Sequence, residues 1–461
     1  MLFSTPQYFV FFSIVVAVFY SLPRRARIPF LLLASYFFYA SWNWKFVPLL
    51  LTLTVIDFFA AQWIEAKQGI KRHGALVMSL VANLGFLGFF KYYNFAARTA
   101  GGILGLPSNS WVLQIVLPLG ISFHTFQSIS YVVDVYRGER EAVRKPLDYA
   151  LFISFFPQLV AGPIVRAREF FADLYAWEPP STQEVKRGAF LIVLGLTKKV
   201  ALADNLSPIV DRYFSGLHSY TGALSAWGAM FAFALQIFFD FSGYTDMAIG
   251  SALLLGFHFP VNFRRPYLAV SITDFWRRWH ISLSSWLRDY LYIPMGGNRR
   301  GRAKTYRNLM ITMLLGGLWH GANWTFIAWG AYHGLLLSLE RMVGIGRQRQ
   351  SSFVAAVPRI ILTFCLVSVG WVFFRSQSFS DAFFVFGQMI SMRGGQWPID
   401  PLLMTLCALS LVIAVLEELN GVTKRLEAIP AWSLGLVLGV LLFVVEIFGT
   451  DRSLPFIYFQ F

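Results

Sequence analysis

The sequence predicts an all-α, polytopic membrane protein, and three observations carry that prediction. Hydrophobic residues make up 56% of the 461 residues and charged residues only 14%, whereas about a quarter of the residues of a soluble domain are charged. Apolar stretches of roughly 20 residues, long enough to cross a hydrocarbon core of ~30 Å, recur from end to end. The alternating strands of a membrane β-barrel do not occur. We therefore expect roughly ten to twelve transmembrane or re-entrant helices.

The positive charge is distributed as expected for a membrane protein. The net charge of +15 is carried mostly by short links between apolar stretches, which the positive-inside rule accounts for, so no nucleic-acid partner is expected. Residues 258–307 exceed this pattern, because ten Lys and Arg stand against Asp274 and Asp289, which gives 10 − 2 = +8. Such a concentration indicates an anionic ligand, anionic lipid headgroups or both.

Apolar runs and basic links divide the first third of the chain into helices. A retained first helix is expected before Arg24, and further spans are expected at residues 28–40, 46–63, 75–95 and 111–136. Residues 151–165 contain Pro157 and Gly162-Pro163, which interrupt the apolar run and predict a broken or re-entrant segment.

The later spans contain two unusual features. Residues 222–256 are too long for one span, and Gly243 is expected to break them into two helices. Asp240 and Asp246 lie in this apolar setting, where an unpaired charge is costly. They are either functional groups or structural ones that pair with arginines or cap a broken helix, and the sequence leaves both readings open. Three or four more spans follow from Ile360 onward.

The stretch from residue 274 to residue 334 organises the chain. Its first half, interpreted as one helix, has an apolar face with three- and four-residue spacing and a mostly polar opposite face. The apolar face comprises Trp276, Trp279, Leu283, Trp286 and Tyr290. His280 lies at the border of the two faces, and His320 lies in Trp-His-Gly-Ala-Asn at the mouth of a strongly apolar segment.

These two histidines are suited to proton transfer. Trp319 and Trp324 are expected to exclude water around His320, and Asn323 is expected to be a polar neighbour on the same helical face. An imidazole, with a pKa of about 6.5, can take a proton from a hydroxyl and return it to a leaving group. One turn along the helix from His280, Ser284 is placed to orient its ring.

Arginines beside His280 suit a phosphorylated acyl donor. Arg277, Arg278 and Arg288 are expected to bind the phosphates of a coenzyme A thioester through charge-assisted hydrogen bonds. Two histidines and a basic loop are a weak signal by themselves. From spacing alone, therefore, an acyltransferase, a transporter and a scaffold all remain open.

The other histidines and the two cysteines favour structural roles. His73 and His218 lie in polar links, whereas His124, His258 and His333 lie in or near apolar runs, where a hydrogen-bonded structural histidine is expected. Cys365 and Cys407 also lie in apolar runs and indicate neither a disulfide nor a metal site. No metal and no permanently bound cofactor is expected.

Long segments of the chain resemble the membrane-bound O-acyltransferase (MBOAT) family, in particular its bacterial branch that acetylates polysaccharides such as alginate. The resemblance lies in FWRRWHISLSSWLRDYLYIPMGGNRRG, GGLWHGANWTFIAWGAYHG, LPLGISFHTFQSISYVVDVYRG, FISFFPQLVAGPIVRAREF and FFDFSGYTDMAIG, which together cover most of residues 117–334. It implies a single acyltransferase domain over residues 1–461 around a central tunnel, with a catalytic core at about 117–343 and flanking helices at 1–116 and 344–461.

The resemblance also implies a reaction and a location in the cell. The family's catalytic histidine falls on His320 and its second active-site position on His280. We also expect Trp319, Asn323 and the three arginines to bind the donor. Acetyl-CoA would be the donor in the cytoplasm. The acetyl group would pass across the bacterial inner membrane to a periplasmic acetyltransferase partner and an exported polysaccharide. Membrane lipids are further expected partners. D-alanyl transfer to teichoic acid, a membrane transporter, and a scaffold subunit of a polysaccharide export complex are the alternatives.

Overall fold

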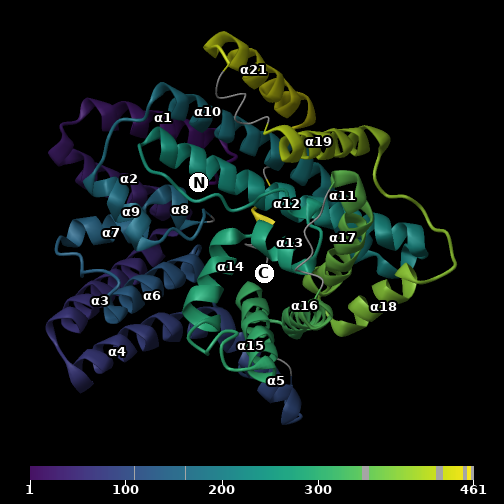
Figure 1. Ribbon diagram of the computed structural model, residues 1–461, viewed down its shortest axis with the longest axis horizontal. Helices are drawn as coiled ribbons and strands as arrows, with labels where there is room; N and C mark the ends of the chain where they lie inside the picture. Colours follow the sequence, from purple (N-terminus) through teal and green to yellow (C-terminus); the bar gives the residue numbers. More distant parts are fainter. Residues whose placement is uncertain (108–109, 161, 345–351, 422–428, 450–453, 458–461) are drawn as a thin grey trace. The chain divides into compact units, whose positions relative to one another are not determined.

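The computed structural model is built of helices. It describes every residue except 108–109, 161, 345–351, 422–428, 450–453 and 458–461. Among the described residues regular structure is helical and no strand occurs (Figure 1). The predicted all-α class is confirmed.

Several helices are long and apolar enough to cross a membrane. Within the described part of the chain six segments meet both conditions, and the shorter Pro6–Ser21 is also apolar. The six are Arg24–Ala66, Gly69–Ile103, Ala223–Leu254, Phe353–Arg375, Pro401–Leu419 and Ala431–Phe448. The polytopic membrane architecture is therefore confirmed, whereas the tally of ten to twelve spans and the central tunnel stay predictions.

The chain divides into two compact units. The first unit comprises Met1–Ala189 and Ala248–Pro260, and the second comprises Phe190–Met247 and Val261–Phe461. Helices α10 (Thr182–Leu196) and α12 (Ala223–Leu254) each contribute to both units. The prediction of one domain with a core at about 117–343 stays a prediction.

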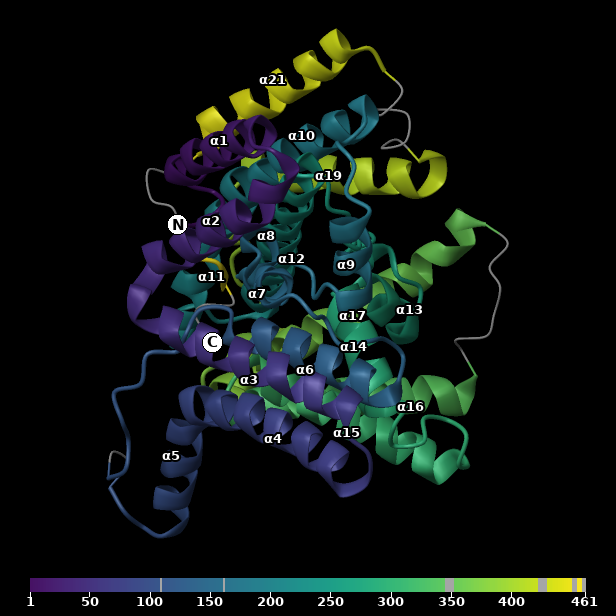
Figure 2. The same ribbon diagram turned by 90° about the vertical axis from the view of Figure 1, so that its left-hand side faces the viewer.

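The first unit contains the N-terminal helices. They are α1 (Pro6–Ser21), α2 (Arg24–Asn43), α3 (Val47–Ala66), α4 (Gly69–Leu87), α5 (Tyr93–Ile103), α6 (Ile121–Arg137), α7 (Pro146–Ser154), α8 (Phe156–Leu159) and α9 (Ala167–Tyr175). Helices α3, α4 and α6 pack against one another, as Figure 2 shows. Buried Asp57 of α3 accepts hydrogen bonds from Ser79 (2.5 Å) and Asn83 (2.8 Å) of α4, so a polar cluster lies inside this packing.

Most of the spans expected in the first third are present, with one correction. The span predicted at 111–136 begins only at Ile121, because the ten residues before it are not helical. The segment predicted to be broken at 151–165 is indeed broken, since α7 ends at Ser154 and α8 is a single turn.

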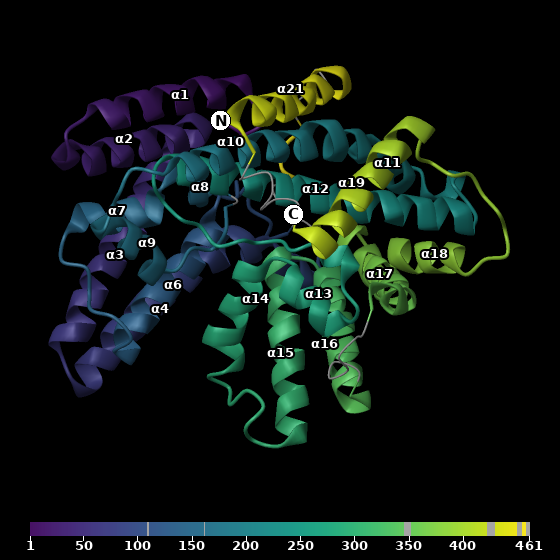
Figure 3. The same ribbon diagram turned by 45° about the horizontal axis from the view of Figure 1, so that its top comes forward.

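The second unit contains the central stretch and the C-terminal helices. They are α11 (Asp204–Ser215), α13 (Ile272–Arg278), α14 (Ile281–Leu287), α15 (Arg302–His320), α16 (Trp324–Val343), α17 (Phe353–Arg375), α18 (Phe379–Met389), α19 (Pro401–Asn420) and α21 (Ala431–Phe448). Helices α15 and α16 pack side by side, as Figure 3 shows. Gly330 allows this close approach, because a Cβ atom there would clash with the backbone oxygen of Met313.

The predicted break at Gly243 is wrong. Helix α12 runs without interruption from Ala223 to Leu254. A Cβ atom at Gly243 would lie 2.6 Å from the backbone oxygen of Gly195 in α10. The glycine therefore serves close packing of two helices, and it does not bend its own helix.

Candidate active site

His280 lies at a break between two short helices. Helix α13 ends at Arg278 and α14 begins at Ile281, while His280 itself has left-handed backbone angles (φ 44°, ψ 55°). Such a conformation costs a non-glycine residue about 1–2 kcal/mol, so the surrounding contacts must impose it. The prediction of one continuous helix through Trp276 and Tyr290 is wrong.

Asn262 supplies those contacts. Its side-chain oxygen lies 3.2 Å from Nδ1 of His280 and accepts hydrogen bonds from the backbone N–H and the hydroxyl of Ser282, at 3.0 and 2.9 Å. Its backbone oxygen accepts from the N–H of Ile281 at 2.9 Å. Ser284, which was expected to orient the ring, instead donates its hydroxyl hydrogen to the backbone oxygen of Trp279. That expectation is wrong.

Aromatic side chains enclose the His280 ring, which is fully buried. Phe241 of α12 contacts it edge to face, with ring centroids 4.6 Å apart. Phe263 lies nearly parallel to it at 6.3 Å, and Trp319 of α15 lies at 6.1 Å. Water exclusion was predicted around His320, whereas His280 was expected at the border of a polar face. The full burial of His280 shows that this expectation is wrong.

His320 is the last residue of α15 and is also buried, at 4% exposure. Its ring contacts Trp319 and Trp329 at centroid distances of 5.0 Å, and Phe374 of α17 at 5.2 Å. Trp319 therefore contacts both imidazoles, and the two histidines predicted to act together belong to one aromatic cluster in the second unit.

Asn323 does not accompany His320. It is the N-cap residue of α16, where its side-chain oxygen accepts a hydrogen bond from the N–H of Thr325. Its amide donates to the backbone oxygen of Gln377 at 2.9 Å. The helix ends at His320, so the spacing that put both residues on one face does not apply, and that expectation is wrong.

His333 is buried in the same aromatic region. Its ring contacts Trp329 at 4.9 Å and Trp276 at 5.2 Å. Neither ring nitrogen has a hydrogen-bond partner among the described residues, so the expectation of a hydrogen-bonded histidine is wrong at this position. Aromatic packing holds this ring.

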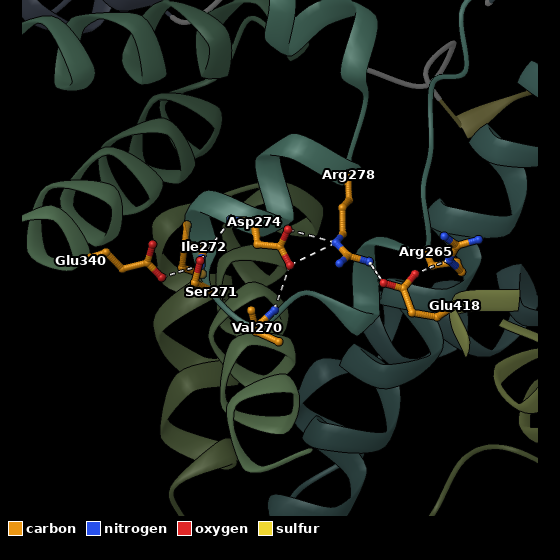
Figure 4. A network of polar contacts seen from close by, with 8 residues as sticks. All are labelled: Arg265, Val270, Ser271, Ile272, Asp274, Arg278, Glu340 and Glu418. Carbon is orange, nitrogen blue, oxygen red and sulfur yellow. Dashed lines mark hydrogen bonds and ion pairs between the residues drawn. The ribbon is translucent and has the colours of Figure 1, made fainter. Parts of the chain in front are cut away.

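The segment that carries His280 is anchored by ion pairs, which Figure 4 shows. Arg278 contacts Asp274 at 3.0 Å and Glu418 of α19 at 3.1 Å, and Arg265 contacts Glu418 at 2.6 Å. Glu340 of α16 accepts from the first two N–H groups of α13, those of Ile272 (2.5 Å) and Thr273 (2.9 Å). These contacts connect α13 to α16 and α19.

The three arginines predicted to bind donor phosphates have different surroundings. Arg277 is exposed. Arg288 is also exposed and lies 2.7 Å from Asp289, whose hydrogen bond raises the pKa of the guanidinium. Arg278 is partly buried between two carboxylates. Arg277 and Arg288 are thus the more accessible of the three to an anionic donor.

Asp240 and Asp246 are neutralised by lysines rather than by the arginines suggested from sequence. Asp240 lies 2.8 Å from Nζ of Lys199, which also contacts Asp204 at 2.7 Å. Asp246 lies 2.6 Å from Nζ of Lys198. This pairing favours the structural reading of both carboxylates. Within the described part of the chain, no cluster of three His, Cys, Asp or Glu side chains could hold a metal ion.

Sequence reasoning missed Asn262, Phe374 and Glu340. Asn262 carried a weak signal, because it is a lone amide among the apolar residues around Phe259 and Phe263. The other two reach the site from α17 and α16, and no local pattern pointed to them.

Comparison with known proteins establishes the family. Residues 142–379 match the membrane-bound O-acyltransferase family, and the match includes both buried histidines. The chain belongs to this family. It is an acyltransferase of the multi-pass membrane type.

Three relatives differ in the acceptor that their names specify. A probable alginate O-acetylase of Pseudomonas syringae pv. tomato is 44% identical over 87% of this chain and 77% of its own length. A peptidoglycan O-acetyltransferase of Helicobacter pylori is 39% identical over 86% of this chain and 80% of its own. A teichoic acid D-alanyltransferase of Bacillus subtilis is 29% identical over 57% and 69%.

Proposed function

We propose that this acyltransferase moves an acetyl group from cytoplasmic acetyl-CoA across the bacterial inner membrane toward O-acetylation of an exported polysaccharide, with alginate as the polysaccharide. The single observation that carries the catalytic part is the pair of buried imidazoles, His280 and His320, in ring contact with Trp319. The acetyl group and the alginate acceptor are supported by the name of the 44% identical relative.

The proposed chemistry assigns the proton to His320. Its imidazole takes the proton of the acceptor hydroxyl while the hydroxyl oxygen attacks the thioester carbonyl carbon. The carbon–sulfur bond then breaks, and the proton passes from His320 to the departing thiolate of coenzyme A. His280 orients the thioester within the same cluster.

The donor's phosphates would bind at the basic surface. Residues 258–307 carry a net charge of +8, and guanidinium groups bind phosphate through paired hydrogen bonds. Arg277 and Arg288 are exposed, so they are the donor ligands we propose. Arg278 remains a weaker candidate, because binding phosphate would require it to leave Asp274 or Glu418.

The experiment is acetyl transfer from radiolabelled acetyl-CoA by the purified chain in lipid vesicles. Wild type is compared with His320→Ala and His280→Ala, first alone and then with a periplasmic acetyltransferase and the polysaccharide. With the acceptor present, we expect thioester consumption that disappears in His320→Ala. Full transfer by folded His320→Ala would overturn the catalytic assignment.

The same vesicles test the alternatives. A transporter would move substrate without consuming thioester, and a scaffold would support polysaccharide acetylation after loss of both histidines. A D-alanyl carrier protein offered in place of acetyl-CoA tests the teichoic acid reading, and we expect no transfer from it. Peptidoglycan fragments offered beside alginate test the acceptor directly.

A further inference from the structure

We propose that Asn262 is a positioning residue that holds the neutral His280 ring with its hydrogen on Nδ1, which leaves Nε2 as the basic nitrogen. The proposal rests on the function proposed above, because it assigns the nitrogen of His280 that is available to the reaction. Asn262 and His280 are both fully buried and lie 18 positions apart in the sequence.

The hydrogen-bond partners of Asn262 fix the orientation of its side-chain amide. The oxygen and nitrogen of an amide side chain are hard to distinguish by shape, so hydrogen-bond partners decide the assignment. The atom that faces His280 also lies 3.0 Å from the backbone nitrogen of Ser282. A backbone N–H can only donate, so the facing atom is the amide oxygen.

The same oxygen determines which ring nitrogen of His280 carries the hydrogen. Nδ1 of His280 lies 3.2 Å from the same oxygen, and an amide oxygen can only accept. Nδ1 therefore carries the hydrogen. A neutral imidazole has one hydrogen, so Nε2 carries the lone pair.

Aromatic side chains and backbone hydrogen bonds hold the His280 ring in place. Phe241 of α12, Phe263 and Trp319 of α15 pack against the ring, and none of these three side chains titrates. The backbone of Asn262 also binds Ile281, and Arg264 donates its N–H to the backbone oxygen of Arg278 at 2.9 Å. Asn262 thus binds the ring of His280 and the backbone of the two residues that follow it.

The direct experiment is ¹⁵N NMR of the full chain in lipid nanodiscs, with only the histidines labelled. The His280 signals are assigned by their absence from His280→Gln. We expect a protonated Nδ1 and an unprotonated Nε2 at neutral pH. A ring with its hydrogen on Nε2 would overturn the proposal. This measurement does not depend on acetyl transfer, so it separates failure of the proposal from failure of the proposed function.

Two variants test the consequence for transfer. Asn262→Asp keeps an acceptor for both His280 and Ser282, but its negative charge favours the imidazolium form, so the acid limb of the pH–rate profile should move up by about one unit or more. Asn262→Ala removes the acceptor, and we expect about a tenfold loss of transfer with unchanged binding of acetyl-CoA.

The matched control is Asn308→Ala, at another fully buried amide, which binds the backbone oxygens of Met295 and Gly297. It should lower stability without moving the pH profile or the His280 tautomer. If Asn262→Asp and Asn262→Ala also lose activity only in step with stability, with no shift of the pH profile, Asn262 is a structural residue and the proposal fails.

Discussion

Two groups of buried polar side chains in the second unit are treated differently by the fold. Lys199 lies between Asp204 and Asp240, with each carboxylate within 2.8 Å of the ammonium, so the two carboxylates share one cation. His280 and His320 instead lie among aromatic rings. The comparison suggests that the ion-paired group stabilises helices, whereas the ring-enclosed imidazoles remain available to exchange protons.

The largest expected effect tests the catalytic half of this comparison. His320→Gln keeps a polar side chain but removes the titrating ring, so acetyl transfer should fall by about 10²–10⁴-fold. Transfer from labelled acetyl-CoA is measured beside thermal unfolding. The control is His124→Gln, which alters a buried histidine of the first unit and should retain transfer. Equal losses in both variants would contradict a special role for His320.

The next effect tests the ion-paired half. Lys199→Met leaves two buried carboxylates without their cation, and removing one partner of a buried ion pair costs about 3–5 kcal/mol. Unfolding in detergent is the measurement, and transfer per folded molecule should not change. Adding Asp204→Asn and Asp240→Asn to the variant should restore much of the stability.

Lys198→Met provides the matched control for this prediction. Lys198 and Asp246 are 21% and 18% exposed at their side chains, so the loss should be smaller than at Lys199. A loss as large at Lys198 would show that burial does not decide the strength of these pairs.

A smaller effect concerns the helix packing beneath His320. Gly330→Ala places a methyl group against the backbone oxygen of Met313, and overpacking of this kind costs about 1–3 kcal/mol. Because α15 ends at His320, separation of α15 from α16 should also lower transfer. Gly387→Ala is the control, since a Cβ atom there meets nothing within 4 Å. Unfolding and transfer are compared for both variants.

Local patterns predicted the parts of the fold that depend on composition. The helices and the burial of His320 beside Trp319 follow from apolar runs and aromatic neighbours. Asn323 could also have been predicted correctly, because Asn before an apolar run is a favoured N-cap. At that position the capping preference of Asn, and not its helical spacing from His320, decides the structure.

The errors arose where distant residues decide the conformation. The spacing around His280 fits a helix on both sides, but hydrogen bonds with Asn262, 18 positions earlier, hold the break. Gly243 in an apolar run indicates either a kink or a close approach, and the choice depends on Gly195. Neither partner can be identified from the local sequence.

A third polar cluster, in the first unit, contains charges that are partly exposed. His258, expected to be hydrogen-bonded, lies 2.7 Å from Glu184 and 3.1 Å from Asp173 in the first unit. The hydrogen bond with His258 is the main cause that lowers the pKa of Glu184 to about 2. The hydrogen bond with Glu184 is likewise the main cause that raises the pKa of His258.

These shifts predict the smallest effect and its pH window. The raised pKa of His258 stabilises the fold fully below its ordinary value of 6.5, and the gain is lost as pH rises through the folded value. The lowered pKa of Glu184 stabilises the fold above its ordinary value of 4.5, and the gain is lost as pH falls toward about 2.

Glu184→Gln should therefore lower the unfolding temperature most between pH 4.5 and 6.5. The corresponding loss in the free energy of unfolding should stay below about 1 kcal/mol, because His258 is largely exposed to solvent. A difference in unfolding temperature that does not vary with pH would contradict this prediction. It would mean that Glu184 acts by packing and by accepting hydrogen bonds from Ser181, and not through its charge.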